Sequence, residues 1–263
     1  MSREVGDIEA PGLHVSSLLG FLAALGTLRL LGGDTKLGWS EAGTAVFRGA
    51  EANRAGLTAF VYAKIQAQPK DVGGSRAWYK CPDKLGGGAK KGGGGAKSEQ
   101  EAHDYLRGAA ESTDVAFQET VASILTYRIP GQDVKKEGRI AKTAFDFQSG
   151  RAVFSKVAME TIARTTEKHV EQALFVYPRV RSGGRSADAE SNLRFEPVDN
   201  VCSAKAGTIE NTVPVDRGAQ RLALEGIPFF SVFRRGLQRA QTGWRRDFEW
   251  GFGMFSWPVW TTT

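Results

Sequence analysis

The run HVSSLLGFLAALGTLRLL, residues 14–31, is the most apolar stretch of this chain and limits what the chain can fold into. A helix here would begin after the paired serines at 16–17 and end at the paired glycines at 32–33. The run contains Arg29, and its uninterrupted apolar part is shorter than the roughly 20 residues that cross a bilayer. We therefore expect a buried helix. Its small residues form a face that a second backbone can approach closely: Gly20, Ala23, Ala24 and Gly26.

Three further elements are indicated before residue 110. Residues 36–47 alternate loosely between apolar and polar types, which predicts a strand or a hairpin ending near residue 47. Residues 54–68 have the pattern of a helix, which Pro69 would end. Ser98 and Glu101 have the spacing of a capping box, so the next helix is expected to begin at Ser98.

The second half of the chain changes character. Residues 145–164 contain two apolar rows at helical spacing, which predicts an amphipathic helix with Ser149 as its cap. From Leu174 onward, short apolar runs between turn residues are typical of strands: LFVYPRV, LRFEPV, LALEGIPFFSVF and FSWPVW. Residues 218–226 are the one possible helix there.

These patterns favour an α+β fold with a helix-rich N-terminal half and a strand-rich C-terminal half. We expect a single mixed domain over residues 1–263, which could comprise two subdomains. The first would cover about residues 1–170 and contain a flexible basic loop at 84–97, and the second would cover about residues 171–263.

The positive charge is concentrated in one segment. Residues 64–97 contain eight Lys or Arg against Asp71 and Asp83, a net charge of +6 that equals the formal net charge of the whole chain. Within it, KLGGGAKKGGGGAK at 84–97 holds seven glycines, four lysines and no acid. A mobile basic loop favours an anionic partner, of which a polyphosphate backbone is the commonest.

Basic residues are mixed with aromatic ones inside this segment, and they also gather at two other places. Residues 76–84 interleave cations with Trp78 and Tyr79, a mixture that can pair with phosphates and stack on bases. Residues 177–186 and 229–246 are rich in arginine beside glycine turns. The predicted nucleic-acid-binding residues are Arg76, Lys80, Lys84, Lys90, Lys91, Lys97, Arg179, Arg181, Arg185, Arg234, Arg235, Arg239, Arg245 and Arg246.

Catalytic patterns are weak. His103-Asp104 is the dipeptide of metal-dependent HD phosphohydrolases, but such a site needs more histidines, and His14 and His169 are the only others. No HExxH, GxSxG or P-loop pattern occurs. We therefore expect no catalytic residue, no metal and no cofactor, and keep a metal-dependent HD-type nuclease using His103 and Asp104 as an alternative. Two scattered cysteines, Cys81 and Cys202, indicate a reducing cytoplasm.

Several segments, taken in order, resemble proteins encoded with type I-G (formerly I-U) CRISPR systems. They are GLHVSSLLGFLAALGTLRLL, FDFQSGRAVF, SNLRFEPVDN, LALEGIPFF and TGWRRDFEWGFGMFSWPVW. The resemblance is to the large-subunit-like and accessory proteins of that subtype. At residues 194–197 this chain has Arg-Phe-Glu-Pro where relatives usually have Arg-Trp-Asp-Pro.

The resemblance implies a non-catalytic subunit of an RNA-guided DNA surveillance complex (Cascade) in antiviral defence. Its partners would be target double-stranded DNA near the flanking motif, CRISPR RNA, other Cascade subunits and the helicase-nuclease, with no membrane. The loop at 84–97 would then be a basic finger that reaches DNA beside the target. Two alternatives remain open: a guide-RNA-binding role without duplex contact, and a protein-binding adaptor whose basic loop is a tether.

Overall fold

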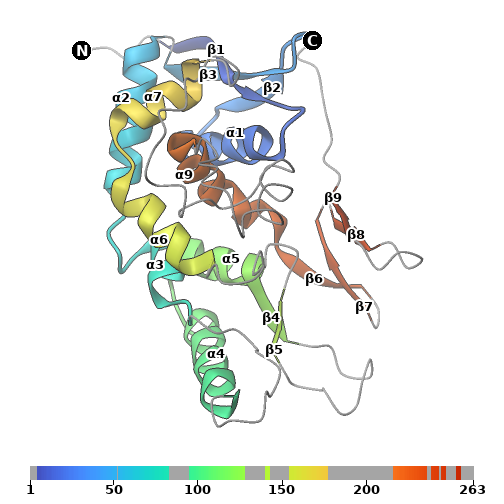
Figure 1. The fold of residues 1–263 in the computed structure, drawn as a ribbon. Helices are drawn as coiled ribbons and strands as arrows, with labels where there is room; N and C mark the ends of the chain where they lie inside the picture. Colours follow the sequence, from blue (N-terminus) through green and yellow to red (C-terminus); the bar gives the residue numbers. More distant parts are fainter. Residues whose placement is uncertain are drawn as a thin grey trace, which may run out of the picture. The chain divides into compact units, whose positions relative to one another are not determined.

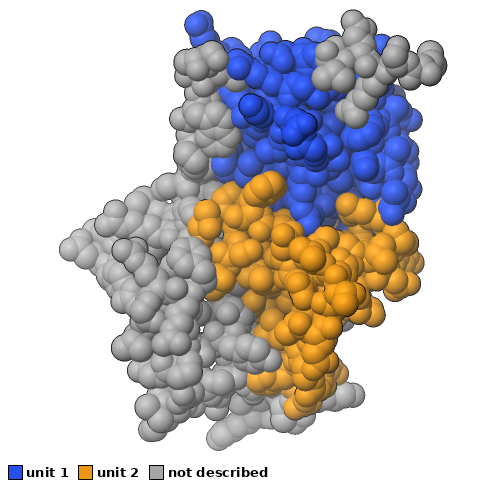
Figure 2. All heavy atoms as spheres, turned by 180° about the vertical axis from the view of Figure 1, so that it is seen from behind, with its two compact units in different colours: residues 1–67, 160–226, 259–263 blue, residues 68–159, 227–258 orange. Residues whose placement is uncertain are grey.

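The computed structural model describes residues 5–51, 53–82, 95–127, 140–142, 154–176, 216–235, 238–242, 244–246 and 253–255. The fold is α+β, as predicted, with helices in the majority (Figure 1). It divides into two compact units, coloured in Figure 2. Unit 1 comprises residues 1–67, 160–226 and 259–263, and unit 2 comprises residues 68–159 and 227–258. The units are thus interleaved along the chain.

Unit 1 contains a three-stranded antiparallel sheet in the order β1-β3-β2. Its strands are β1 (Val5–His14), β2 (Lys36–Trp39) and β3 (Thr44–Glu51). The expected hairpin at 36–47 is therefore confirmed, and its second strand continues to Glu51. Trp39 is fully buried and stacks on Phe21, with ring centroids 6.0 Å apart, which anchors the hairpin to the helix that precedes it.

The predicted apolar helix is α1 (Leu18–Leu31). Ser17 caps it by accepting a hydrogen bond from the backbone N–H of Gly20, and Gly32 ends it with a φ of 59°. Its small-residue face packs against α9 (Arg217–Gly226), which confirms both the face and the possible helix at 218–226. A Cβ added at Gly26 would lie 1.8 Å from the carbonyl oxygen of Leu222, so only glycine allows this close approach.

Two capped helices complete unit 1. Asn53 caps α2 (Arg54–Gln66), which confirms the helix expected there, and Thr166 caps α7 (Glu167–Phe175) in a capping box with His169. The expectation of a strand from Leu174 is wrong at its start, because α7 continues to Phe175. Buried Leu174 belongs to the apolar face of this amphipathic helix, so the apolar residues there follow the 3.6-residue repeat of a helix rather than the two-residue repeat of a strand.

Helix α6 (Phe154–Arg164) confirms the predicted amphipathic helix, with Val157, Ala158 and Thr161 buried. Its expected cap, Ser149, lies outside the described residues.

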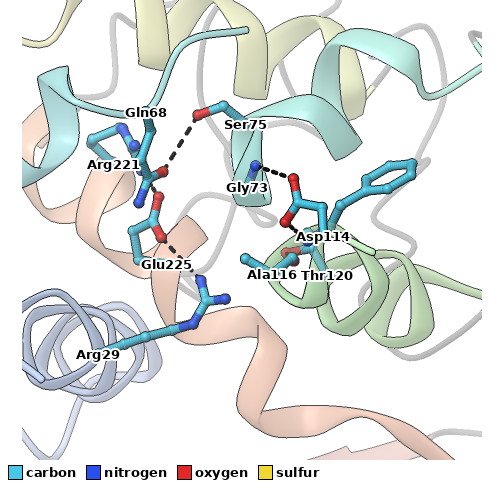
Figure 3. Close-up of polar contacts among 10 residues, drawn as sticks. Arg29, Gln68, Gly73, Ser75, Asp114, Ala116, Thr120, Arg221 and Glu225 are labelled. Atoms are coloured by element: carbon cyan, nitrogen blue, oxygen red, sulfur yellow. Dashed lines mark hydrogen bonds and ion pairs between the residues drawn. The ribbon is translucent and has the colours of Figure 1, made fainter. Parts of the chain in front are cut away.

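Unit 2 contains three helices, α3 (Gly73–Lys80), α4 (Gly95–Ala110) and α5 (Val115–Ile124), and α5 packs against both α3 and α4 (Figure 1). Asp114 joins two of them, since one carboxylate oxygen accepts from the N–H of Gly73 and the other from that of Phe117 (Figure 3). Helix α4 begins at Gly95, so the prediction that Ser98 caps it is wrong. Gly95, Ala96 and Lys97 already follow the helical path, which places Ser98 inside the first turn.

The remaining elements of unit 2 are short. Strands β4 (Leu125–Tyr127) and β5 (Ile140–Lys142) form an antiparallel pair, and the 3-10 turn η2 (Ile227–Phe230) packs on α5. A four-stranded antiparallel sheet then has the order β6-β7-β8-β9. Its strands are β6 (Val232–Arg235), β7 (Gln238–Gln241), β8 (Trp244–Arg246) and β9 (Gly253–Phe255).

The strand-rich C-terminal half stays a prediction, because residues 177–215 and 256–263, which would carry much of it, lie outside the described part. None of the helices in the described residues is long and apolar enough to cross a membrane.

Candidate nucleic-acid interface

The sheet β6–β9 holds five of the predicted binding residues: Arg234, Arg235, Arg239, Arg245 and Arg246. The register places Arg234 directly opposite Arg239 on the neighbouring strand. Because strand residues alternate between faces, the positions 234, 239 and 246 fall on one face and the positions 235 and 245 on the other. The four strands contain no aspartate or glutamate. The sheet is therefore a strongly basic element.

Arg76 and Lys80, the other described candidates, lie one turn apart on α3 and line a cavity of about 540 Å³. The cavity is a partly open hollow lined by residues of α3, α4 and α5 and the segment after α3. They are Arg76, Lys80, Pro82, Glu101, Asp104, Tyr105, Gly108 and Phe117. Unit 2 thus combines a basic sheet with a mixed-charge cavity.

The guanidinium of Arg76 is held by its surroundings. It lies 4.5 Å from the ring centroid of Phe117, and its Nη1 donates to Ser112 Oγ at 3.4 Å, a long hydrogen bond. Its Nε is buried and has no hydrogen-bond partner among the described residues. The side chain is therefore positioned by stacking more than by hydrogen bonds, which leaves donors for an anion.

Several predicted residues cannot be placed. Lys84, Lys90, Lys91, Arg179, Arg181 and Arg185 lie outside the described residues. Position 97 falls in the first turn of α4. The proposed base-stacking role of Trp78 is wrong, because its side chain is 2% exposed and belongs to the core of unit 2. Tyr79 is half-buried, and the ammonium of Lys70 lies 5.2 Å from its ring centroid.

The His103-Asp104 pair lies in the middle of α4. Asp104 Oδ1 accepts from Gln100 Nε2 at 3.0 Å and from Arg107 Nη2 at 2.5 Å, so this carboxylate is engaged in local surface contacts. Within the described part of the chain, no group of three or more His, Cys, Asp or Glu side chains could hold a metal ion.

Sequence reasoning missed the acidic and aromatic residues of the cavity. Glu101 and Asp104 face it from α4, Tyr105 and Phe117 form its apolar wall, and the Tyr105 hydroxyl donates to the carbonyl of Ala77 at 2.7 Å. Burial, with a smaller contribution from Cys81, raises the pKa of the Tyr105 phenol well above its usual value. The i, i+3 spacing of Glu101 and Asp104 was the one available signal, and it is common on solvated helices.

The cavity and the basic sheet thus rest on the geometry of this chain alone. No protein-family model, no curated protein and no solved structure matches the chain.

Proposed function

We propose that this chain is a non-catalytic nucleic-acid-binding protein whose unit 2 contacts the phosphate backbone. The proposed setting is an RNA-guided DNA surveillance complex of the type I-G kind, with target DNA, guide RNA, the other Cascade subunits and the helicase-nuclease as partners. The order of the five sequence segments supports that setting. The basic sheet β6–β9 supports the activity.

The observation that carries the proposal is the cross-strand pair Arg234–Arg239. Like charges directly opposite each other destabilise an antiparallel pair by a few tenths of a kcal/mol up to about 1 kcal/mol. No acid in the four strands offsets this cost. An anionic ligand would offset it, and arginine is the side chain that pairs with phosphate bidentately.

The test is fluorescence anisotropy of the purified chain with a labelled DNA duplex and with guide-like RNA over a salt series. The double variant Arg234→Gln/Arg239→Gln removes two cations from the sheet. Each lost phosphate contact lowers the slope of log K against log salt by about 0.9, so we expect the slope to fall by about two. Comparing the two ligands separates a duplex-contacting role from a guide-RNA role.

The matched control is Lys36→Gln/Arg48→Gln, because these two cations are also cross-strand neighbours, in the sheet of unit 1. It removes the same charge from a sheet whose Arg48 has Asp7 beside it, with Nε and Oδ2 3.7 Å apart. We expect this control to leave the salt slope unchanged. An equal loss in both double variants would mean that only net charge matters, and no loss in either would refute the proposal.

A second arm tests the basic loop. Replacing Lys84, Lys90, Lys91 and Lys97 with glutamine should flatten the salt dependence by about three to four ions if the loop is a finger on the phosphate backbone. An unchanged slope would mean that the loop acts as a tether, and that of these two elements the sheet alone contacts the phosphate backbone.

A further inference from the structure

We propose that the cavity between α3, α4 and α5 binds one unstacked nucleotide. The phosphate would lie on the α3 cations, and a base with an amino group would lie against the apolar wall and the α4 carboxylates. This inference rests on the proposed function and names the ligand unit that the cavity takes. All of its lining residues belong to unit 2.

The size of the cavity favours a ligand larger than an inorganic anion. Its volume is about 540 Å³, within the roughly 300–1,000 Å³ usual for small-molecule sites. A single phosphate would fill a small part of that space. A nucleotide offers an anion at one end and a flat ring at the other, and the cavity has a matching division.

The cationic side is formed by α3. Arg76 and Lys80 are four residues apart and therefore lie on the same face of the helix. The Arg76 guanidinium is held against Phe117, so its donors are oriented before any ligand arrives. Lys80 is exposed and forms no ion pair among the described residues. This pair of cations suits a phosphate group.

The acidic side is formed by α4. Glu101 is exposed and has no hydrogen bond or ion pair within the described part of the chain, whereas Asp104 is engaged through Oδ1 by Arg107 and Gln100. The cations of α3 and the acids of α4 line one cavity, yet no ion pair joins them among the residues described. Opposite charges kept apart in this way suit a ligand that carries an anion and hydrogen-bond donors at separate ends.

The wall between the two sides is aromatic. Phe117 is 1% exposed, and the hydroxyl of Tyr105 is already used by the carbonyl of Ala77, so neither ring is free to turn toward a phosphate. Both rings are too buried to stack on a base themselves, so the half-buried ring of Pro82 is the apolar surface on which a base can rest. A fully anionic ligand, such as an acidic peptide, would be repelled by Glu101 and would leave this wall without a partner.

The experiment is isothermal titration calorimetry of the full chain with adenosine monophosphate, adenosine and inorganic phosphate. We expect the nucleotide to bind more tightly than either part. Lys80→Gln changes an exposed side chain without risk to the fold and should lower nucleotide affinity about tenfold. Arg76→Gln should do the same where circular dichroism shows the variant folded.

Whether Glu101→Gln raises or lowers nucleotide affinity decides if this carboxylate contacts the base. A base-contacting carboxylate predicts weaker nucleotide binding and unchanged or tighter phosphate binding, while Glu111→Gln, an exposed control just after α4, changes neither. Equal tightening of both ligands would show that Glu101 only repels anions and would overturn the inference.

Wild-type anisotropy with single-stranded oligonucleotides keeps the two proposals separate. If the chain binds oligonucleotides but not the mononucleotide, the cavity proposal is refuted and the proposed function stands. If it binds the mononucleotide but not oligonucleotides, the cavity proposal is supported and the proposed function is refuted.

Discussion

In unit 1, Arg29, Arg48 and Arg221 each have a carboxylate beside them, whereas the sheet of unit 2 places Arg234 opposite Arg239. Arg48 lies across the strand pair from Asp7, and Arg221 Nη1 donates to Glu225 Oε1 at 2.6 Å. Arg234 lies across from Arg239, with no acid in the four strands. In unit 1 these ion pairs help to hold the fold together, and the unbalanced charge of the unit 2 sheet is what the proposed ligand would neutralise.

The clearest case in unit 1 is the buried group Arg29–Glu225–Arg221 (Figure 3). Glu225 bridges both arginines, through Oε2 to Arg29 at 3.1 Å and through Oε1 to Arg221. Arg221 is 1% exposed, and its Nε and Nη2 have no hydrogen-bond partner among the described residues. The charge of Arg221 is therefore tolerable only because Glu225 is beside it.

The largest effect is expected from removing that carboxylate. Glu225→Gln leaves Arg221 charged and buried without compensation, which should cost about 3–5 kcal/mol in the free energy of unfolding. Urea denaturation followed by circular dichroism measures the loss. The double variant Arg221→Met/Glu225→Gln removes the buried charge along with its partner and should recover part of the stability. If it recovers none, the loss does not come from the uncompensated charge.

The next effect tests the packing that brings α1 and α9 together. Gly26→Ala would place a Cβ 1.8 Å from the backbone oxygen of Leu222, and backbone cannot move aside as a side chain can. We expect a loss of about 3 kcal/mol, measured by thermal and urea denaturation.

The matched control for this glycine is Gly108→Ala in α4, where a Cβ meets no atom within 4 Å. That substitution should stabilise the chain by about 0.5–1 kcal/mol, since alanine is the better helix former. Equal losses of stability from both substitutions would mean that the close approach of α1 and α9 is not the reason position 26 requires glycine.

A third prediction concerns a variant in which the sheet of unit 2 gains a carboxylate beside its arginines, as Asp7 lies beside Arg48 in unit 1. Position 241 shares a face with positions 234 and 239, so Gln241→Glu adds a carboxylate beside the arginine pair. We expect nucleic-acid affinity to fall about tenfold, or about 1.4 kcal/mol, and the melting temperature to rise slightly. Gln172→Glu, at an exposed position of α7, is the control with the same charge change and should leave affinity unchanged. Similar losses in both would remove the sheet from the binding surface.

The smallest effect concerns a neutral buried group. Tyr105→Phe removes the hydrogen bond to the carbonyl of Ala77 and should cost about 1 kcal/mol at neutral pH. Because the pKa of Tyr105 is raised in the folded chain, the unfolded chain loses this proton first, and the phenol's contribution to stability declines above about pH 10.

Urea denaturation of the wild type and of Tyr105→Phe, at neutral pH and above about pH 10, checks this pH dependence. The stability difference between wild type and Tyr105→Phe should shrink at the higher pH. A difference that stays constant would show that the phenol ionises equally easily in both states.

Local patterns were enough for some elements and not for others. The helix α1 was predictable with its cap and its end, because Ser17 and Gly32 act on their own neighbours in the chain. Helix α3 was not predicted, because GGSRAWYK begins with two glycines and has poor intrinsic propensity. It forms because Ala77 and Trp78 are buried in unit 2 and Asp114 of another segment holds its first turn.

For the candidate site, the sequence determined which residues are basic and that they gather in a few segments, since charge and composition need no fold. Only the tertiary structure decided that Arg234 faces Arg239 across a strand pair, that Trp78 is core, and that Glu101 shares a cavity with Arg76. It also decided that Glu225, 196 residues from Arg29, neutralises it. These contacts join segments distant in the chain, and local periodicity carries no information about such partners.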